Sequence, residues 1–95
     1  MTYKIKISSK AFSDIQSAID YYNKVQTGLG KKFKLAIEII FNQLKNIPAS
    51  GSFLYENIRY RVVKKFPFII VYEIIEEKFI YIYRIFNTNQ NPFWM

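Results

Sequence analysis

The chain of 95 residues is 51% hydrophobic and 19% aromatic, with three Gly and three Pro, which is the composition of one folded domain with a modest core. It has no Cys and no His, so it forms no disulfide, lacks the usual zinc ligands and has no imidazole for nucleophilic or general-base catalysis. The formal net charge of +7 favours anionic partners, although such an excess of positive charge also serves solubility alone.

A short strand and a helix are predicted at the start of the chain. Tyr3, Ile5 and Ile7 alternate with lysines, and a period of two is typical of a strand with one buried face. Ser8 or Ser9 can cap the helix that follows, along which apolar residues recur at helical spacing. These apolar residues are Ala11, Ile15, Ala18, Ile19 and Tyr22.

A second helix is predicted after a glycine turn at Gly28-Leu29-Gly30. It carries an apolar stripe and ends at Pro48, because a residue that precedes proline is disfavoured in the helical region. The stripe consists of Phe33, Ala36, Ile37, Ile40, Phe41, Leu44 and Ile47. The short turn favours an antiparallel pair of helices.

Three strands are predicted beyond Pro48, at residues 58–62, 68–75 and 79–86, with turns at 65–67 and 76–78. The middle strand is almost wholly apolar, so we expect it to be central in the sheet and covered on both faces. The expected fold class is α+β with the order β-α-α-β-β-β, in which the N-terminal strand and the helix hairpin pack on an antiparallel sheet. Residues 1–95 are expected to form a single domain, with Phe93 and Trp94 folded back onto the sheet.

Nothing in the sequence points to a membrane, a metal or a cofactor. The N-terminus has no long apolar segment and the apolar stretch 66–75 is too short to span a bilayer, so we expect a cytoplasmic protein that does not bind membranes. Gly28-Leu29-Gly30-Lys31 lacks the spacing of a phosphate loop and follows a helix. Glu76-Glu77 is typical of a turn rather than of a metal site.

Several short motifs follow one another along the chain. They are Ala11-Phe12-Ser13-Asp14-Ile15, Tyr21-Tyr22, Gly28-Leu29-Gly30, Phe33, Ile58-Arg59, Phe66-Pro67-Phe68, Val71-Tyr72-Glu73, Ile85-Phe86-Asn87-Thr88 and Asn91-Pro92. Each is common by itself, but the ordered set covers nearly the whole chain and resembles the RelE/ParE superfamily of small bacterial toxins, in particular its ParE branch. The element order predicted above agrees with the fold of that superfamily.

The resemblance implies a toxin of a type II toxin–antitoxin system, which a cognate antitoxin protein binds and neutralises. ParE-like members inhibit DNA gyrase without a known hydrolytic step, and RelE-like members cut messenger RNA in the ribosome. We therefore expect a ParE-like toxin that acts by binding a target such as gyrase. The alternatives are a RelE-like endoribonuclease acting on the ribosome and its message, and a non-toxic relative that retains antitoxin binding.

The catalytic positions of RelE-like nucleases argue against that chemistry here. Ile69 and Thr88 stand near the positions of two arginines in the RelE-like pattern, and Trp94 stands near that of a tyrosine. Many members have a His where this chain has Asn87, and an amide cannot exchange a proton near neutral pH. The resemblance therefore leaves the catalytic residues unassigned and favours a protein that is not an enzyme.

Arg59 is the first candidate for binding a target or an antitoxin, because the family usually has an arginine at this point and a guanidinium binds carboxylate or phosphate through two hydrogen bonds. The alternative is an ion pair with Glu73 or Glu56 that joins strands. Arg61 shares the strand face of Arg59 by its period of two, and the pair would form one cationic patch.

The remaining candidates follow the same strand or lie near the C-terminus. Lys64 and Lys65 extend the charge into a turn, where a solvated basic turn explains them equally. Arg84 shares the face of Ile80 and Ile82, so it must reach solvent or pair with an acid. Asn87 and Trp94 complete the set of binding candidates. The tyrosines of the last strands offer faces for stacking on bases, although at strand spacing such residues are more often packing.

Overall fold

The computed structural model describes residues 2–89, which form two α-helices, five strands and one short 3-10 helix. In chain order these elements are β1 (Lys4–Ile7), α1 (Ser9–Val25), α2 (Leu29–Asn46), η1 (Pro48–Ser50), β2 (Ser52–Tyr55), β3 (Ile58–Val62), β4 (Phe68–Ile75) and β5 (Phe79–Asn87). The predicted order of strands and helices is confirmed, and β2 is an additional strand that the sequence pattern did not indicate.

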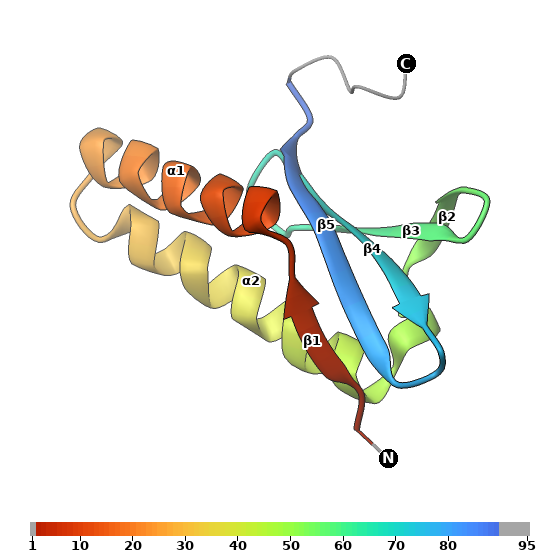
Figure 1. Cartoon of the computed structure of the whole chain (residues 1–95). Coiled ribbons are helices and arrows are strands. Elements are labelled where there is room, and N and C mark those ends of the chain that lie inside the picture. Colours follow the sequence, from red (N-terminus) through yellow and green to blue (C-terminus); the bar gives the residue numbers. More distant parts are fainter. Residues whose placement is uncertain (1, 90–95) are drawn as a thin grey trace.

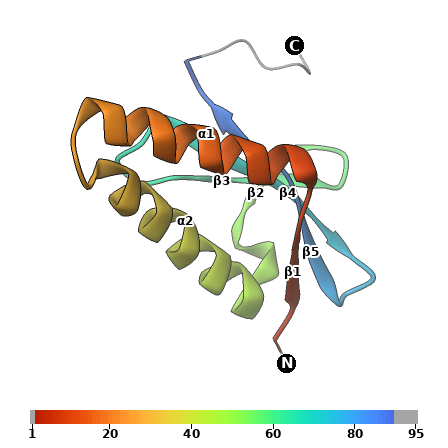
Figure 2. The ribbon, with the colours of Figure 1, turned by 60° about the vertical axis from the view of Figure 1, so that its left-hand side comes forward.

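The strands form one sheet in the order β1-β5-β4-β3-β2. The strands from β2 to β5 are antiparallel to their neighbours, as predicted, whereas β1 pairs with β5 in parallel, so the sheet is mixed. Both helices lie on one side of this sheet, and within the described chain no helix covers its other face (Figures 1 and 2). This arrangement is the predicted α+β domain.

The helix hairpin begins and turns where the sequence indicates. The Oγ of Ser8 accepts a hydrogen bond of 3.0 Å from the backbone N–H of Ala11 and caps α1. Gly28 joins the helices with a φ of 89°, a left-handed conformation that residues with a Cβ seldom adopt. Pro48 begins η1 just after α2, because its ring cannot continue the helical hydrogen bonds.

The core lies between the hairpin and the helix-facing side of the sheet. Alternate residues of the two central strands point into it, as the strand periodicity requires. Its fully buried side chains include Ile70, Tyr72, Ile80 and Ile82.

An aromatic cluster closes the core where the turn between β3 and β4 meets the helices. Its rings are those of Tyr22, Phe33, Phe66 and Phe68. The Phe66 ring lies 5.1 Å from that of Tyr22 and 5.2 Å from that of Phe33, both edge-to-face. These contacts hold the lysine-bearing turn beside the two helices.

Three expectations differ from the structure or fall outside it. Ile47 continues the apolar stripe of α2 in sequence, but it lies past the end of that helix and is 63% exposed. β4 is the central strand, yet only its helix-facing side is covered by another element of the described chain. The expected return of Phe93 and Trp94 to the sheet concerns residues outside the described part. Between residues 2 and 89, no helix is long and apolar enough to cross a bilayer.

Candidate binding surfaces

Arg59 holds the segment that joins α2 to β2. One of its nitrogens, Nη1, donates to the carbonyl oxygen of Gly51 at 2.9 Å and to that of Ala49 at 3.3 Å. Its guanidinium also lies over the ring of Phe53, 3.9 Å from the ring centroid. Arg59 therefore stabilises a connection between elements through Nη1, while no hydrogen bond from its Nε or Nη2 is found within residues 2–89.

Arg61 shares the face of Arg59, as predicted, and binds the same connection. Its Nη1 donates to Ser50 Oγ at 2.9 Å, and its Nη2 donates to Gln43 Oε1 on α2 at 2.7 Å. Both partners are exposed and neutral, so these bonds add little stability and can be exchanged for others. Arg61 can accordingly leave them for an anionic ligand more easily than Arg59 can.

The ion pair considered for Arg59 with Glu73 or Glu56 is not formed. Arg59 stands opposite Tyr72 on β4, so Glu73, the next residue, projects from the other face of the sheet. There the Tyr83 hydroxyl donates to Glu73 Oε1 at 2.6 Å. Within residues 2–89 the one ion pair lies elsewhere, between α1 and β5.

The Tyr72 hydroxyl binds the same connection from inside the core. It donates to the carbonyl oxygen of Pro48 at 2.6 Å and accepts from the backbone N–H of Gly51 at 3.0 Å. A Cβ at Gly51 would lie 2.8 Å from the Tyr72 ring, so no larger residue fits there. Burial raises the pKa of Tyr72, while the Gly51 hydrogen bond and the charges of Arg59 and Arg61 lower it.

Arg84 pairs with an acid, which is one of its two predicted outcomes. Its Nε donates to Asp14 Oδ2 at 2.7 Å and its Nη2 donates to Oδ1 at 3.1 Å, while Oδ2 also accepts the backbone N–H of Ile85 at 3.1 Å. The hydrogen bond to Asp14 raises the pKa of Arg84 although burial lowers it. The pair fastens α1 to the edge of β5, beyond the end of β1.

The predicted position of Arg84 on the face of Ile80 and Ile82 is wrong. The pairing between β4 and β5 shifts by one residue, so that Val71 faces Arg84 and Tyr83 has no direct partner. Such a β-bulge reverses the side-chain alternation from that point on. The bulge turns Arg84 away from the core and lets it reach Asp14 around the strand edge.

The C-terminal candidates remain predictions. Asn87 ends β5 half-buried, and its Oδ1 accepts the backbone N–H of Asn89 at 2.8 Å. It lines a polar cleft with Tyr21 and with the paired Arg84. Trp94 lies outside the described residues.

A groove runs between α2 and β3, and its walls are largely apolar. Leu35 is 50% exposed there, Ile39 58% and Val62 61%. Its rim carries Lys32, Lys64 and Lys65. The two lysines predicted as candidates are exposed and form no ion pair within the described chain. Exposed apolar side chains inside a charged rim are typical of a protein-binding surface.

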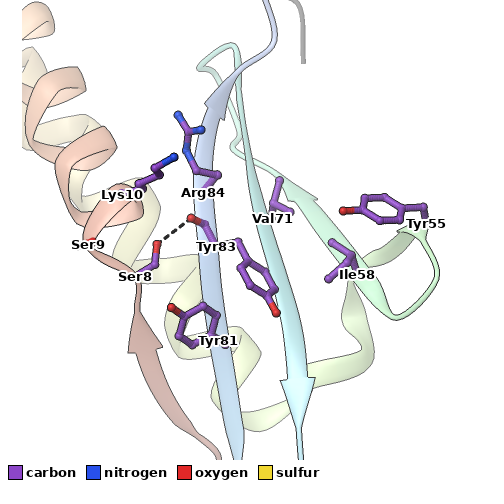
Figure 3. Close-up of a pocket in the computed structure, with 9 residues that line it drawn as sticks. All are labelled: Ser8, Ser9, Lys10, Tyr55, Ile58, Val71, Tyr81, Tyr83 and Arg84. Carbon is purple, nitrogen blue, oxygen red and sulfur yellow. Dashed lines mark hydrogen bonds between the residues drawn. The ribbon is translucent and has the colours of Figure 1, made fainter. Parts of the chain in front are cut away.

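A hollow lies on the opposite, helix-free face of the sheet (Figure 3). Tyr55, Tyr81 and Tyr83 line it, while Lys10 and Arg84 stand along its upper margin. We call this hollow, together with Glu73, which lies beside it as the strand neighbour of Tyr81 and the hydrogen-bond partner of Tyr83, the tyrosine hollow. Ser8, which follows β1, holds the backbone of Tyr83 in place: its Oγ donates to the carbonyl oxygen of Tyr83 at 2.8 Å. In the described chain, no group of three His, Cys, Asp or Glu side chains could hold a metal ion.

Three features of these surfaces were not predicted from the sequence. Leu35 and Ile39 are one helical turn apart and off the core stripe, and this spacing was a usable signal for the groove. The pairing of Asp14 with Arg84 joins residues that are 70 positions apart, and no local pattern indicates it. The position of Glu73 beside Tyr83 depends on the bulge in β5, which also has no sequence signal.

The chain matches a family model described as the ParE toxin of type II toxin–antitoxin systems, parDE, over residues 5–92. No curated protein matches the sequence significantly. Among solved structures, the fold is similar to a chain of the chromosomal ParDE toxin–antitoxin system from P. aeruginosa, with a TM-score of 0.77 and 20% identity. The alignment covers 90% of this chain and 96% of that one. Because the family match spans nearly the whole described domain, the chain belongs to the family of ParE toxins of type II toxin–antitoxin systems.

Proposed function

We propose that the protein arrests growth by binding a macromolecular target, DNA gyrase, and that a cognate antitoxin neutralises it by occupying the groove between α2 and β3. Membership of the ParE family supports the toxin class. The choice of gyrase follows from what ParE-like toxins act on, and the choice of the groove follows from the chemistry of its walls.

The observation that carries the proposal is the division of the basic side chains. Arg59 and Arg84, which a nuclease could use to hold a phosphate, are engaged by backbone carbonyls and by Asp14. The lysines at the groove have no such partners within residues 2–89. These two arginines therefore support the fold, whereas the lysines remain open to an acidic partner.

The groove suits an amphipathic segment of the antitoxin. Leu35 and Ile39 offer apolar contacts that a helix or strand with apolar anchors would cover. Acidic residues flanking those anchors would face Lys32, Lys64 and Lys65. The charge of the rim would speed association, and the apolar floor would supply most of the affinity.

Binding explains the toxin better than cleavage does. Attack by a ribose hydroxyl needs a proton acceptor and cations for the phosphate. The sequence contains no His, and Asn87 cannot take the proton. Arg59 and Arg84 are held in structural contacts.

Expression with and without the antitoxin tests the proposal. The toxin alone should slow growth, and co-expression of the antitoxin from the neighbouring gene should restore it. Normal growth at confirmed soluble expression would refute the toxin. Tight antitoxin binding without growth arrest would indicate the non-toxic relative.

Two assays then separate the targets. Purified toxin should inhibit DNA supercoiling by gyrase, and translated message should stay intact in primer extension. Message cuts that disappear in Arg59→Ala would instead support the RelE-like alternative.

A further inference from the structure

The centre of the helix-free sheet face is built around a carboxylate. Glu73 lies on β4 between Ile58 of β3 and Tyr81 of β5, which are its direct neighbours across the strands. The Tyr83 hydroxyl donates to Glu73 Oε1 at 2.6 Å. The rings of Tyr81 and Tyr83 lie edge to face, with centroids 4.8 Å apart. Glu73 is thus half-buried inside an aromatic frame.

Tyr55 completes the frame from the neighbouring hairpin. It pairs with Ile58, so its side chain projects from the same face as Glu73. In Figure 3 the rings of Tyr55 and Tyr83 stand on either side of Val71. The tyrosine hollow therefore receives side chains from β2, β4 and β5.

A hydrogen bond between a tyrosine hydroxyl and a carboxylate determines the charge and protonation of the tyrosine hollow. The hydrogen bond to Glu73 is the main cause that raises the pKa of Tyr83 to about 12, with burial and the nearby charges adding to it. The hydroxyl is therefore a fixed donor to the carboxylate near neutral pH. No cation pairs with Glu73 in the described chain, since the ion pair found there joins Asp14 and Arg84. The carboxylate of Glu73 is thus available to a cationic group of a partner on this face.

This chemistry selects a cationic side chain over an anion. A phosphate placed in the hollow would be repelled by Glu73, and Arg84 at the margin is already neutralised by Asp14. Lys10 is a further cation at the upper margin. Lys6 stands beside Tyr81 on the same face, where its Nζ lies 4.0 Å from the ring centroid of Phe79. A guanidinium would pair with the carboxylate and lie against tyrosine faces at the same time. Tyrosine and arginine are also enriched among the residues that contribute most to binding energy in protein interfaces.

We propose that the tyrosine hollow is a second protein-binding site, which receives an arginine side chain of the toxin's target protein. The identity of that partner as the target rests on the proposed function, whereas the arginine site itself does not. The hollow lies on the helix-free face and the groove lies beside α2, so each surface can be altered without touching the other.

Nuclear magnetic resonance with a small probe tests the arginine site directly. N-acetylarginine amide should shift the ring signals of Tyr81 and Tyr83, and N-acetylcitrulline amide, which is isosteric and uncharged, should not. In Glu73→Gln the affinity for the arginine probe should fall about tenfold, because the charge is lost while the acceptor for Tyr83 is kept. Unchanged core signals will show that the variant is folded. Equal shifts with both probes, or equal affinity in the variant, would overturn the site.

A growth assay tests the role of the site in the cell. Glu73→Gln and Glu73→Lys should arrest growth less than the wild type at equal soluble expression, and both should bind the antitoxin with unchanged affinity. Full arrest by Glu73→Lys would refute a role in target binding. If the wild type itself fails to arrest growth, the proposed function fails, while the probe titration still decides whether the hollow binds arginine.

Discussion

Basic side chains have opposite roles in two regions of this molecule: the contacts that join the helices to the sheet, and the groove between α2 and β3. Where α2 joins β2 and where α1 meets β5, Arg59 and Arg84 are held by carbonyl oxygens and by a carboxylate, respectively. Along the groove between α2 and β3, the lysines surround apolar side chains that no described residue covers. Residue type separates the two regions, because a guanidinium satisfies several acceptors at once and an ammonium remains a mobile, solvated charge.

The residues that stabilise the fold thus differ from those that we expect to bind a partner. Arg59 and Arg84, which the sequence indicated as binding candidates, stabilise the fold. Leu35 and Ile39, which it did not indicate, lie on the proposed binding surface. Substitutions in the first region should therefore lower stability, and substitutions in the second should lower affinity without changing stability.

Asp14→Ala should have the largest effect on stability. It leaves the partly buried Arg84 without its carboxylate and removes the acceptor of the Ile85 N–H. Loss of such a pair costs about 2–3 kcal/mol of the free energy of unfolding. Urea denaturation followed by circular dichroism measures it. A loss below about 0.5 kcal/mol, the size expected of a surface change, would mean that the pair is a replaceable surface contact.

Tyr72→Phe should rank next. The ring keeps its apolar packing, but the Gly51 N–H and the Pro48 carbonyl lose their partner in the core. The expected cost is about 1–3 kcal/mol, because groups left unsatisfied in a buried setting lose their solvation. Tyr60→Phe is a matched control on a neighbouring strand, since no hydrogen bond of its hydroxyl is found in the described chain, and it should change the free energy of unfolding little. Equal stability of the two variants would contradict the buried role of the Tyr72 hydroxyl.

Replacing Lys64 and Lys65 together by Ala should leave the free energy of unfolding unchanged, because both are exposed. Antitoxin affinity should fall about three- to tenfold and lose part of its dependence on salt. Titration calorimetry at two ionic strengths provides the measurement. Lys4 and Lys6 on β1 lie away from the groove, and their double replacement serves as the control of equal charge.

The smallest expected effect is a change in the pKa of the Tyr83 hydroxyl. Glu73→Gln should lower the pKa of Tyr83 from about 12 toward its ordinary value of 10.0, because the charge of the acceptor is removed. In the wild type, the stabilising contribution of the protonated Tyr83 is complete below pH 10 and is lost as the pH rises to about 12. Titration of carbon-labelled tyrosines resolves Tyr83 from the others. An unchanged pKa in the variant would exclude the hydrogen bond to Glu73 as the cause.

Local patterns were enough to predict most of the fold. The apolar stripes, the Ser8 cap and the glycine turn depend on residues close together in the sequence, and each was found where it was expected except for Ile47 at the end of the second stripe. β2 was missed because its four residues lack alternation, and it forms by pairing with β3.

The candidate site was harder to predict because its contacts are distant in sequence. The shared face of Arg59 and Arg61 followed from strand periodicity, but their carbonyl and glutamine partners come from the end of α2 and the segment after it. The bulge before Arg84 leaves one residue of β5 without a direct partner on β4. From that residue to the end of the strand, each side chain projects from the face opposite to the one that simple alternation predicts. No pattern of apolar residues reveals such a shift, and it decides where both Arg84 and Glu73 find their partners.

The most direct test of the account compares antitoxin binding by two variants, Ile39→Glu and Arg59→Gln, in titration calorimetry. Ile39→Glu should weaken antitoxin binding about a hundredfold, since it places a charge on the apolar floor of the groove, and it should unfold at the same urea concentration as the wild type. Arg59→Gln should be less stable and should bind the antitoxin with an affinity within about threefold of the wild type. The opposite result, with binding lost in Arg59→Gln and kept in Ile39→Glu, would contradict the division between supporting arginines and a recognising groove.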